Sequence, residues 1–137
     1  MSIVCIDPGH GGSDPGACGN GLRECDIALI VALKVRGYLQ TVGYQVVMTR
    51  ETDKDVGYPN DSASEELQAR CDISNNAGAD VFVSIHCNAA GSEDAKGTET
   101  FYYEGSVNGE RLATKIDAQL AGLKLVDRGI KDNPLYV

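Results

Sequence analysis

The sequence has 137 residues, of which 42% are hydrophobic and 23% are charged. This length is sufficient for one globular domain with a buried core. No apolar run approaches the roughly 18 residues that a transmembrane helix requires, so no transmembrane segment is expected. The formal net charge is −8 and the 12 Lys and Arg residues are scattered. That argues against a nucleic-acid-binding protein, because binding to phosphates relies on clustered positive charge.

The N-terminus passes directly from Met1 into the apolar residues 3–6. It has neither a basic segment nor a small-residue cleavage site, so we do not expect it to be a signal peptide. Either the protein is made without one, or this is a domain of a longer exported chain. The export route is not visible in the sequence.

Five cysteines are present, and an odd number cannot all pair within the chain. None lies in a CxxC motif, so a finger-type structural zinc site is not supported. A disulfide between Cys18 and Cys25 is possible, but free thiols are the favoured state. The five are Cys5, Cys18, Cys25, Cys71 and Cys87.

The first half of the chain alternates between short strands and helices. Residues 3–6 form a continuous apolar run, typical of a strand covered on both faces, and a Pro- and Gly-rich loop follows. Residues 24–41 are expected to be helical, with Gly43 ending the helix, and residues 44–49 form a second strand. The apolar stripe of this helix is predicted to comprise Ile27, Ile30, Val31, Val35 and Tyr38.

The second half continues the alternation. Ser62 and Glu65 resemble a capping box that opens a helix extending to Gly78. Strands are expected at residues 81–86 and 98–103. A last helix follows, ends at Gly122, and buries one face formed by Leu112, Ala113, Ile116 and Leu120. The order of elements predicts an α/β fold, a three-layer sandwich in which helices flank a mostly parallel twisted sheet.

Both histidines of the chain follow predicted strands. His10 lies beyond the carboxyl end of the first strand and His86 ends the third. Functional groups in open α/β sheets gather at this edge, so parallel strands would bring the two imidazoles together.

Glu24 is the candidate third member of the site. Its spacing from Ile27 and Val31 places it on the sheet-facing side of the first helix turn. The helix N-terminus stabilises a negative charge by only ~0.3–1 kcal/mol, whereas desolvating an unpaired carboxylate costs far more. Glu24 should therefore have a cation as its partner.

Two imidazoles and a carboxylate are the ligands of many catalytic zinc sites. We therefore predict Zn²⁺ bound by His10, Glu24 and His86. Asp7, Asp14 and Ser84 are candidates for orienting the imidazoles. The alternative is that the three residues are unrelated and that His86 is an ordinary core histidine.

Several motifs resemble those of the zinc-dependent N-acetylmuramoyl-L-alanine amidases of the Amidase_3 type. The combination of Asp-Pro-Gly-His-Gly-Gly at residues 7–12 with Ser-Ile-His-Cys-Asn at residues 84–88 is quite specific, and the similarity covers essentially the whole chain. The matching segments are residues 6–17 with Glu24, residues 46–50, Arg70 with residues 75–80, residues 83–89 and residues 97–103.

The resemblance implies a zinc-exopeptidase-like fold and a single amidase catalytic domain over residues 1–137. It also implies that His10, Glu24 and His86 bind the metal. The implied reaction is hydrolysis of the amide between N-acetylmuramic acid and the L-alanine of the stem peptide. Peptidoglycan is then the partner, and the cell wall or the extracellular space is the place of action, as for an autolysin.

One departure from the family concerns its catalytic glutamate, which lies on a strand after the segment that matches residues 135–137. That glutamate would lie beyond Val137, so no catalytic residue is assigned within the chain. We expect a C-terminally truncated domain that lacks the last strand, the last helix and the general base, and that is weakly active or inactive as written. Glu99 is a weak substitute for that base, because it fits better as an ordinary strand residue.

Two alternative functions remain open at this point. The first is a non-catalytic module, similar to the amidases, that binds zinc or peptidoglycan without cleaving it. The second is a different zinc amidohydrolase, such as a sugar de-N-acetylase, which would use the same metal chemistry.

Overall fold

The computed structural model describes residues 2–58, 60–88 and 96–134. The described residues fall into two compact units, one within residues 2–88 and the other within residues 96–134. The expected single domain over residues 1–137 stays a prediction. In the described part of the chain, no helix combines the length and the apolar character needed to cross a membrane.

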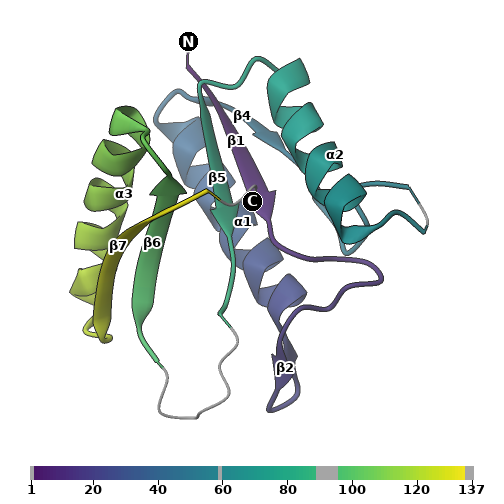
Figure 1. Cartoon of the computed structure of the whole chain (residues 1–137), viewed down its shortest axis with the longest axis horizontal. Helices are drawn as coiled ribbons and strands as arrows, with labels where there is room; N and C mark the ends of the chain where they lie inside the picture. Colours follow the sequence, from purple (N-terminus) through teal and green to yellow (C-terminus); the bar gives the residue numbers. More distant parts are fainter. Residues whose placement is uncertain (1, 59, 89–95, 135–137) are drawn as a thin grey trace. The chain divides into compact units, whose positions relative to one another are not determined.

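The first unit contains a three-stranded parallel sheet in the order β4-β1-β5 (Figure 1). Its strands are β1 (Ile3–Pro8), β4 (Gln45–Met48) and β5 (Val81–Ile85). The central strand is buried from Val4 through Pro8. This confirms the strand predicted from the continuous apolar run and explains that run, because β1 is covered on both faces.

Alternation along β1 assigns one helix to each face of the sheet. Val4 and Ile6 belong to the core cluster that includes Ala32 of α1 (Glu24–Thr41). Cys5 and Asp7 point the other way: the Cys5 thiol is hydrogen-bonded to Ser74, and Asp7 is ion-paired with a second residue of α2 (Ala63–Asn76). Side chains of a strand alternate between faces, so the first unit has the three layers α1, sheet and α2.

The face that α1 buries differs from the predicted stripe. Its buried residues are Glu24, Cys25, Ala28 and Ala32, whereas Ile30, Val31 and Tyr38 of the predicted stripe are exposed. The helix carries apolar residues on more than one side, so periodicity alone could not select the contact face. Small alanines let the helix approach the sheet closely, and Glu24 shares their face at spacings of four and eight.

Local signals for the ends of the helices agree with the structure. Ser62 accepts a hydrogen bond from the Glu65 N–H, and the Glu65 carboxylate accepts one from the Ser62 N–H, which completes the predicted capping box. Gly43 has φ 92° and follows α1 closely. A two-residue hairpin, β2 (Cys18–Gly19) with β3 (Leu22–Arg23), precedes α1 and was not predicted.

The second unit pairs β6 (Thr98–Tyr103) in parallel with β7 (Asp127–Asn133), and α3 (Val107–Leu120) lies between them in the chain. The sequence did not predict β7, because its residues are mostly polar and lack strand alternation. A 3₁₀ turn, η1 (Ala121–Leu123), continues past Gly122, and Lys124 ends it with φ 60°. The α-helix itself ends at Leu120, close to the predicted end at Gly122, and η1 follows it.

The C-terminal end of the chain carries one sequence prediction that the structure does not test. The truncation was expected after Val137, and Val137 lies outside the described residues together with residues 135 and 136. The absence of a last strand, a last helix and a general base therefore stays a prediction.

The capping box gives a test of local stability. Replacing Ser62 by Ala removes the acceptor for the Glu65 N–H at the start of α2, and should lower the free energy of unfolding by about 0.5–2 kcal/mol. Urea unfolding followed by circular dichroism measures the difference. The matched control is Ser64→Ala, at an exposed position within the first turn of the same helix. An equal loss in both variants would contradict the role of the cap.

Candidate metal centre

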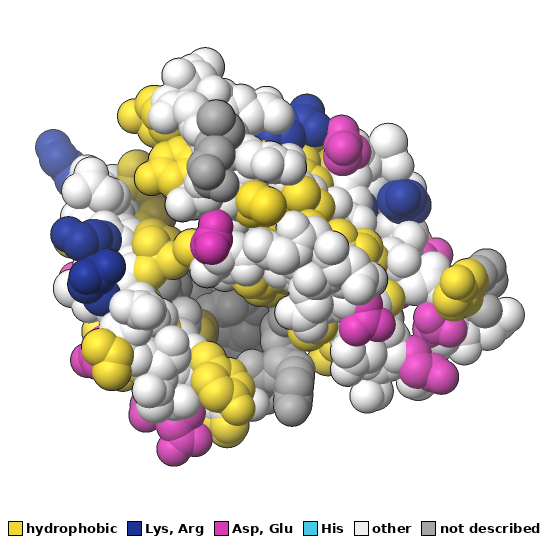
Figure 2. Space-filling model, turned by 90° about the horizontal axis from the view of Figure 1, so that it is seen from above, with side chains coloured by type: hydrophobic (Ala, Val, Ile, Leu, Met, Phe, Trp, Pro, Cys, Tyr) yellow, Lys and Arg dark blue, Asp and Glu magenta, His cyan; other side chains and the backbone are white. Residues whose placement is uncertain are grey.

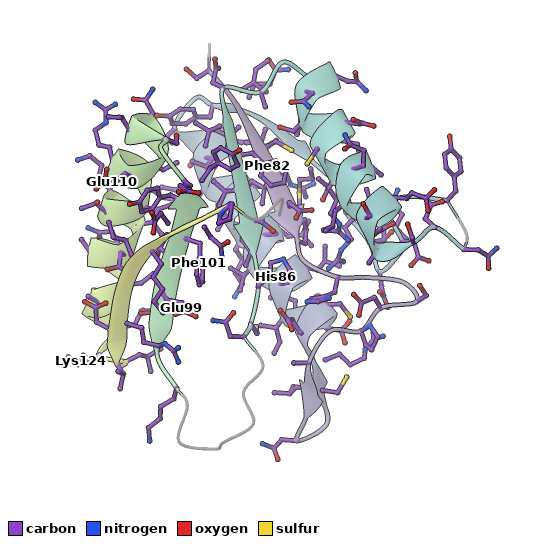
Figure 3. All side chains as sticks on the ribbon, in the orientation of Figure 1. Phe82, His86, Glu99, Phe101, Glu110 and Lys124 are labelled. Atoms are coloured by element: carbon purple, nitrogen blue, oxygen red, sulfur yellow. The ribbon has the colours of Figure 1, made fainter. Side chains whose placement is uncertain are left out.

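Three side chains from separate elements meet at the carboxyl edge of the parallel sheet. His10 lies two residues beyond β1, His86 follows β5 directly (Figure 3), and Glu24 is the first residue of α1. The His10 Nε2 atom lies 3.2 Å from Glu24 Oε1, and His86 Nδ1 lies 3.3 Å from the same oxygen. The two ring nitrogens are 3.2 Å apart. The three residues predicted as ligands are thus brought together.

This spacing suits a metal ion better than it suits hydrogen bonding. A tetrahedral zinc ion with ligands at about 2.0–2.2 Å holds neighbouring donor atoms about 3.3–3.5 Å apart. The three donor pairs of this site are all 3.2–3.3 Å apart. One proton can bridge only one of those pairs, so the remaining lone pairs face each other unless a cation lies among them.

Asp14 orients the ring of His10. The Asp14 Oδ2 atom lies 2.7 Å from His10 Nδ1, and this hydrogen bond is the main reason that the pKa of Asp14 lies below its usual value. A carboxylate accepts a hydrogen bond, so Nδ1 carries the hydrogen and Nε2 presents its lone pair to the centre of the site. Asp14 therefore takes the orienting part expected for it.

Glu24 is held as a carboxylate by the main chain. Its burial alone would raise the pKa, but the N–H groups of Ala17 and Cys87, with the charges of His10 and His86, lower the pKa overall. Ala17 N donates to Oε2 over 3.0 Å and Cys87 N donates to Oε1 over 2.6 Å. Sequence reasoning missed both donors, because any residue type except proline can supply a main-chain N–H.

The imidazole of His86 is held in its neutral form. Partial burial is the first cause that lowers its pKa and the charge of His10 is the second, and together they outweigh the opposing effect of Glu24. A neutral imidazole is the form that binds a metal. His86 therefore needs no deprotonation at neutral pH to act as a ligand.

Two glycines make room for the imidazole rings. A Cβ atom on Gly9 would lie 2.4 Å from the Cε1 atom of His86. Gly16 has φ 66°, and a Cβ there would lie 2.6 Å from the Cδ2 atom of His10. His10 itself has φ 57°, a conformation that few non-glycine residues adopt. The Gly-rich sequence around His10 is thus a packing requirement of the site.

Asp7 and Ser84 have a different structural role from the predicted one. Asp7 is fully buried and accepts hydrogen bonds from Thr49 Oγ1, Arg70 Nη1 and Ser84 Oγ. This network joins β1, β5 and α2 beneath the site. The expectation that these two residues orient the imidazoles is therefore wrong, because their polar atoms are used within the network.

A second group of possible metal ligands, Cys25 with Asp26 and Asp53, occurs among the described residues. Arg23 donates to both carboxylates, at 2.7–2.9 Å, and so supplies the positive charge that a metal would bring. Burial raises the pKa of the Cys25 thiol, which keeps it protonated and unsuited to metal binding. All five cysteines are free thiols, including Cys18, so the possible disulfide does not form.

Glu99, the substitute considered for a general base, belongs to β6 of the second unit (Figure 3). Its carboxylate forms ion pairs with Lys131 and Arg128. The hydrogen bond from Lys131 is the main cause that lowers its pKa. A carboxylate stabilised in this way is a poor proton carrier, which favours the structural interpretation of Glu99.

Known proteins resemble this chain in sequence and in fold. The chain matches the Amidase_3 family, described as N-acetylmuramoyl-L-alanine amidase, over residues 4–137. It is 42% identical over 124 residues to the germination-specific N-acetylmuramoyl-L-alanine amidase of Bacillus subtilis (strain 168), covering 86% of this chain and 52% of that protein. Identity to the amidase LytC of the same organism is 39% over 138 residues, covering 98% of this chain and 26% of that protein.

Solved structures agree. The CwlD amidase of Clostridioides difficile, determined in complex with the GerS lipoprotein, gives a TM-score of 0.90 at 32% identity, covering 97% of this chain and 73% of that chain. The catalytic domain of the amidase CwlV from Bacillus (Paenibacillus) polymyxa var. colistinus gives a TM-score of 0.78 at 34% identity. That match covers 100% of this chain and 73% of that chain. The chain spans about half the length of the germination-specific relative. It belongs to the Amidase_3 family of N-acetylmuramoyl-L-alanine amidases.

Proposed function

We propose that this chain carries the metal centre of a zinc-dependent peptidoglycan amidase. The substrate is the amide between N-acetylmuramic acid and the L-alanine of the stem peptide, and the reaction is hydrolysis of that bond. The observation that carries the proposal is the convergence of His10 Nε2, Glu24 Oε1 and His86 Nδ1, with each pair 3.2–3.3 Å apart. Membership of the Amidase_3 family supports the choice of substrate.

When bound, zinc would lower the pKa of a water molecule to roughly 7 and polarise the amide carbonyl. The chain's own residues prepare the ligand atoms for it. Asp14 fixes the tautomer of His10, and the Cys87 and Ala17 N–H groups anchor one carboxylate oxygen of Glu24 each. Three protein ligands leave a further position for water or substrate, as catalytic zinc sites require.

The substrate implies where the protein acts. Two relatives carry the name N-acetylmuramoyl-L-alanine amidase, and their substrate is part of the cell wall. We infer that this chain acts in the cell wall or the extracellular space. On the face drawn in Figure 2, Lys and Arg side chains do not gather into one broad patch. That nucleic acid is not a partner stays a prediction, which rests on the net charge of −8.

The reaction is tested by the end group that appears when purified cell wall is digested with the wild-type protein. We expect free L-alanine amines, released slowly because no general base is assigned within residues 1–137, and expect His86→Ala to abolish their release. Glu99→Gln should retain most of the release, because Glu99 is held in ion pairs within the second unit. Release of glucosamine would instead indicate a de-N-acetylase. Binding to wall material without any new end group would indicate a non-catalytic module.

The ligand assignment is tested by metal analysis. The purified chain should bind about one zinc ion, and His10→Ala or His86→Ala should lose it to a mild chelator, because two remaining ligands rarely hold zinc. Arg36→Lys, a change at an ion pair between α1 and Glu51, is the control for nonspecific loss. Stoichiometric zinc in either histidine variant after chelation would show that the assignment is wrong.

The cysteines give the complementary prediction. Cys25→Ser and Cys87→Ser should leave the zinc content unchanged, because Cys25 is a buried protonated thiol and Cys87 acts through its main-chain N–H. Zinc content and circular dichroism are measured together for each variant. Loss of zinc from a folded Cys87→Ser variant would make its sulfur a ligand.

A further inference from the structure

Two buried arginines surround the loop that carries His10. Arg50 is 1% exposed and Arg70 is 3% exposed. Arg50 Nε donates to Pro8 O over 3.0 Å and its Nη2 donates to Gly9 O over 2.8 Å. Arg70 Nη1 also donates to Pro8 O, and its Nη2 donates to His10 O, each over 3.0 Å. Three consecutive carbonyl groups that end at His10 are therefore bonded to guanidinium groups.

Each arginine also connects this loop to the element that carries another ligand. Arg50 Nη2 donates to Cys25 O over 2.9 Å, at the residue next to Glu24. Arg70 Nη1 donates to Asp7 Oδ1 over 2.7 Å, and the other oxygen of Asp7 accepts from Ser84 Oγ, two residues before His86. One arginine thus bridges towards Glu24 and the other towards His86.

Arg50 is a buried charge whose hydrogen bonds are directed at the main chain. Burial of a charge is unfavourable unless it is paired, yet the hydrogen bonds of Arg50 to the described residues go to main-chain carbonyl oxygens. The four acceptors are Pro8 O, Gly9 O, Cys25 O and Thr52 O. A planar guanidinium can reach several acceptors in fixed directions, and a lysine ammonium cannot reproduce that arrangement.

We propose that Arg50 and Arg70 are positioning residues that hold His10 at its separation from Glu24 and His86 before the metal arrives, and so set the zinc affinity. This inference rests on the proposed metal centre. It gives these residues no contact with the metal or the substrate. A backbone such as that of His10, with φ 57°, needs surrounding contacts to keep it in place.

Two possible roles of Arg50, its positive charge and its positioning of the loop, predict opposite effects of substitution on the zinc affinity. A guanidinium repels a divalent cation, so if charge were decisive, Arg50→Met would raise the zinc affinity. If position is decisive, Arg50→Met and Arg50→Lys both lower it. Changing residues that support metal ligands commonly reduces metal affinity about 10–100-fold, and we expect a loss of that size in Arg50→Lys and Arg70→Lys.

The experiment measures zinc affinity by competition with a chromophoric chelator, and the visible absorption of the Co²⁺-loaded chain, which reports the coordination geometry. Arg36→Lys is the matched control, because Arg36 forms an ion pair with Glu51 outside the network. We expect wild-type zinc affinity and a wild-type cobalt spectrum in Arg36→Lys. We expect weaker zinc binding and an altered cobalt spectrum in Arg50→Lys and Arg70→Lys. Wild-type affinity in both Arg50→Lys and Arg70→Lys, or a gain in Arg50→Met, would overturn the inference.

A second measurement needs no substitution and covers variants that fail to fold. Nuclear magnetic resonance follows exchange of the arginine Nε hydrogens in the metal-free wild-type chain. The Arg50 Nε hydrogen, bonded to Pro8 O, should exchange much more slowly than that of Arg36. Equal exchange rates would contradict positioning before metal binding. A wild-type chain that binds no zinc would overturn the metal centre itself, whereas normal zinc binding with unaffected arginine variants would overturn only this inference.

Discussion

The buried carboxylate of Glu24 is the interaction on which the rest of the site depends. It is 4% exposed, and burial alone would raise its pKa, but the hydrogen bonds from the Ala17 and Cys87 N–H groups hold the pKa below its usual value. His10 Nε2 and His86 Nδ1 both lie within 3.3 Å of Glu24 Oε1, and a carboxylate oxygen cannot donate a hydrogen bond to either. A cation at its centre, as in the proposed zinc site, would complete the arrangement electrostatically.

Most of the support for this centre comes from backbone atoms. Gly9 and Gly16 let the main chain approach the imidazole rings more closely than any side chain would allow. Glu24 is anchored by two peptide N–H groups, while Arg50 and Arg70 fix the carbonyl groups on the other side of the loop. Peptide N–H groups therefore hold the carboxylate of Glu24, and guanidinium groups hold the loop that carries His10. These contacts explain how a long Gly-rich segment can keep one conformation.

Sequence patterns were sufficient to predict those parts of the molecule that depend on hydrophobic periodicity and on strand direction. The apolar β1 indicated a covered central strand, and parallel strands placed His10 and His86 at one edge. Glu24 is buried as predicted, but the reason differs: Val31, which was expected to share its buried face, is exposed, and Ala28 and Ala32 form that face instead. The partners of Asp7 and of the two arginines could not be predicted, because they are tertiary contacts to side chains and carbonyl groups far away in the chain.

The most direct test of the metal centre is zinc-edge X-ray absorption of the metal-loaded wild-type chain. The geometry around Glu24 predicts a first shell of nitrogen and oxygen atoms at about 2.0–2.2 Å, with two imidazole rings visible in the outer scattering. A sulfur atom at about 2.3 Å would instead place a cysteine on the metal. A single imidazole, or a sulfur in that shell, would contradict the assignment of His10, Glu24 and His86.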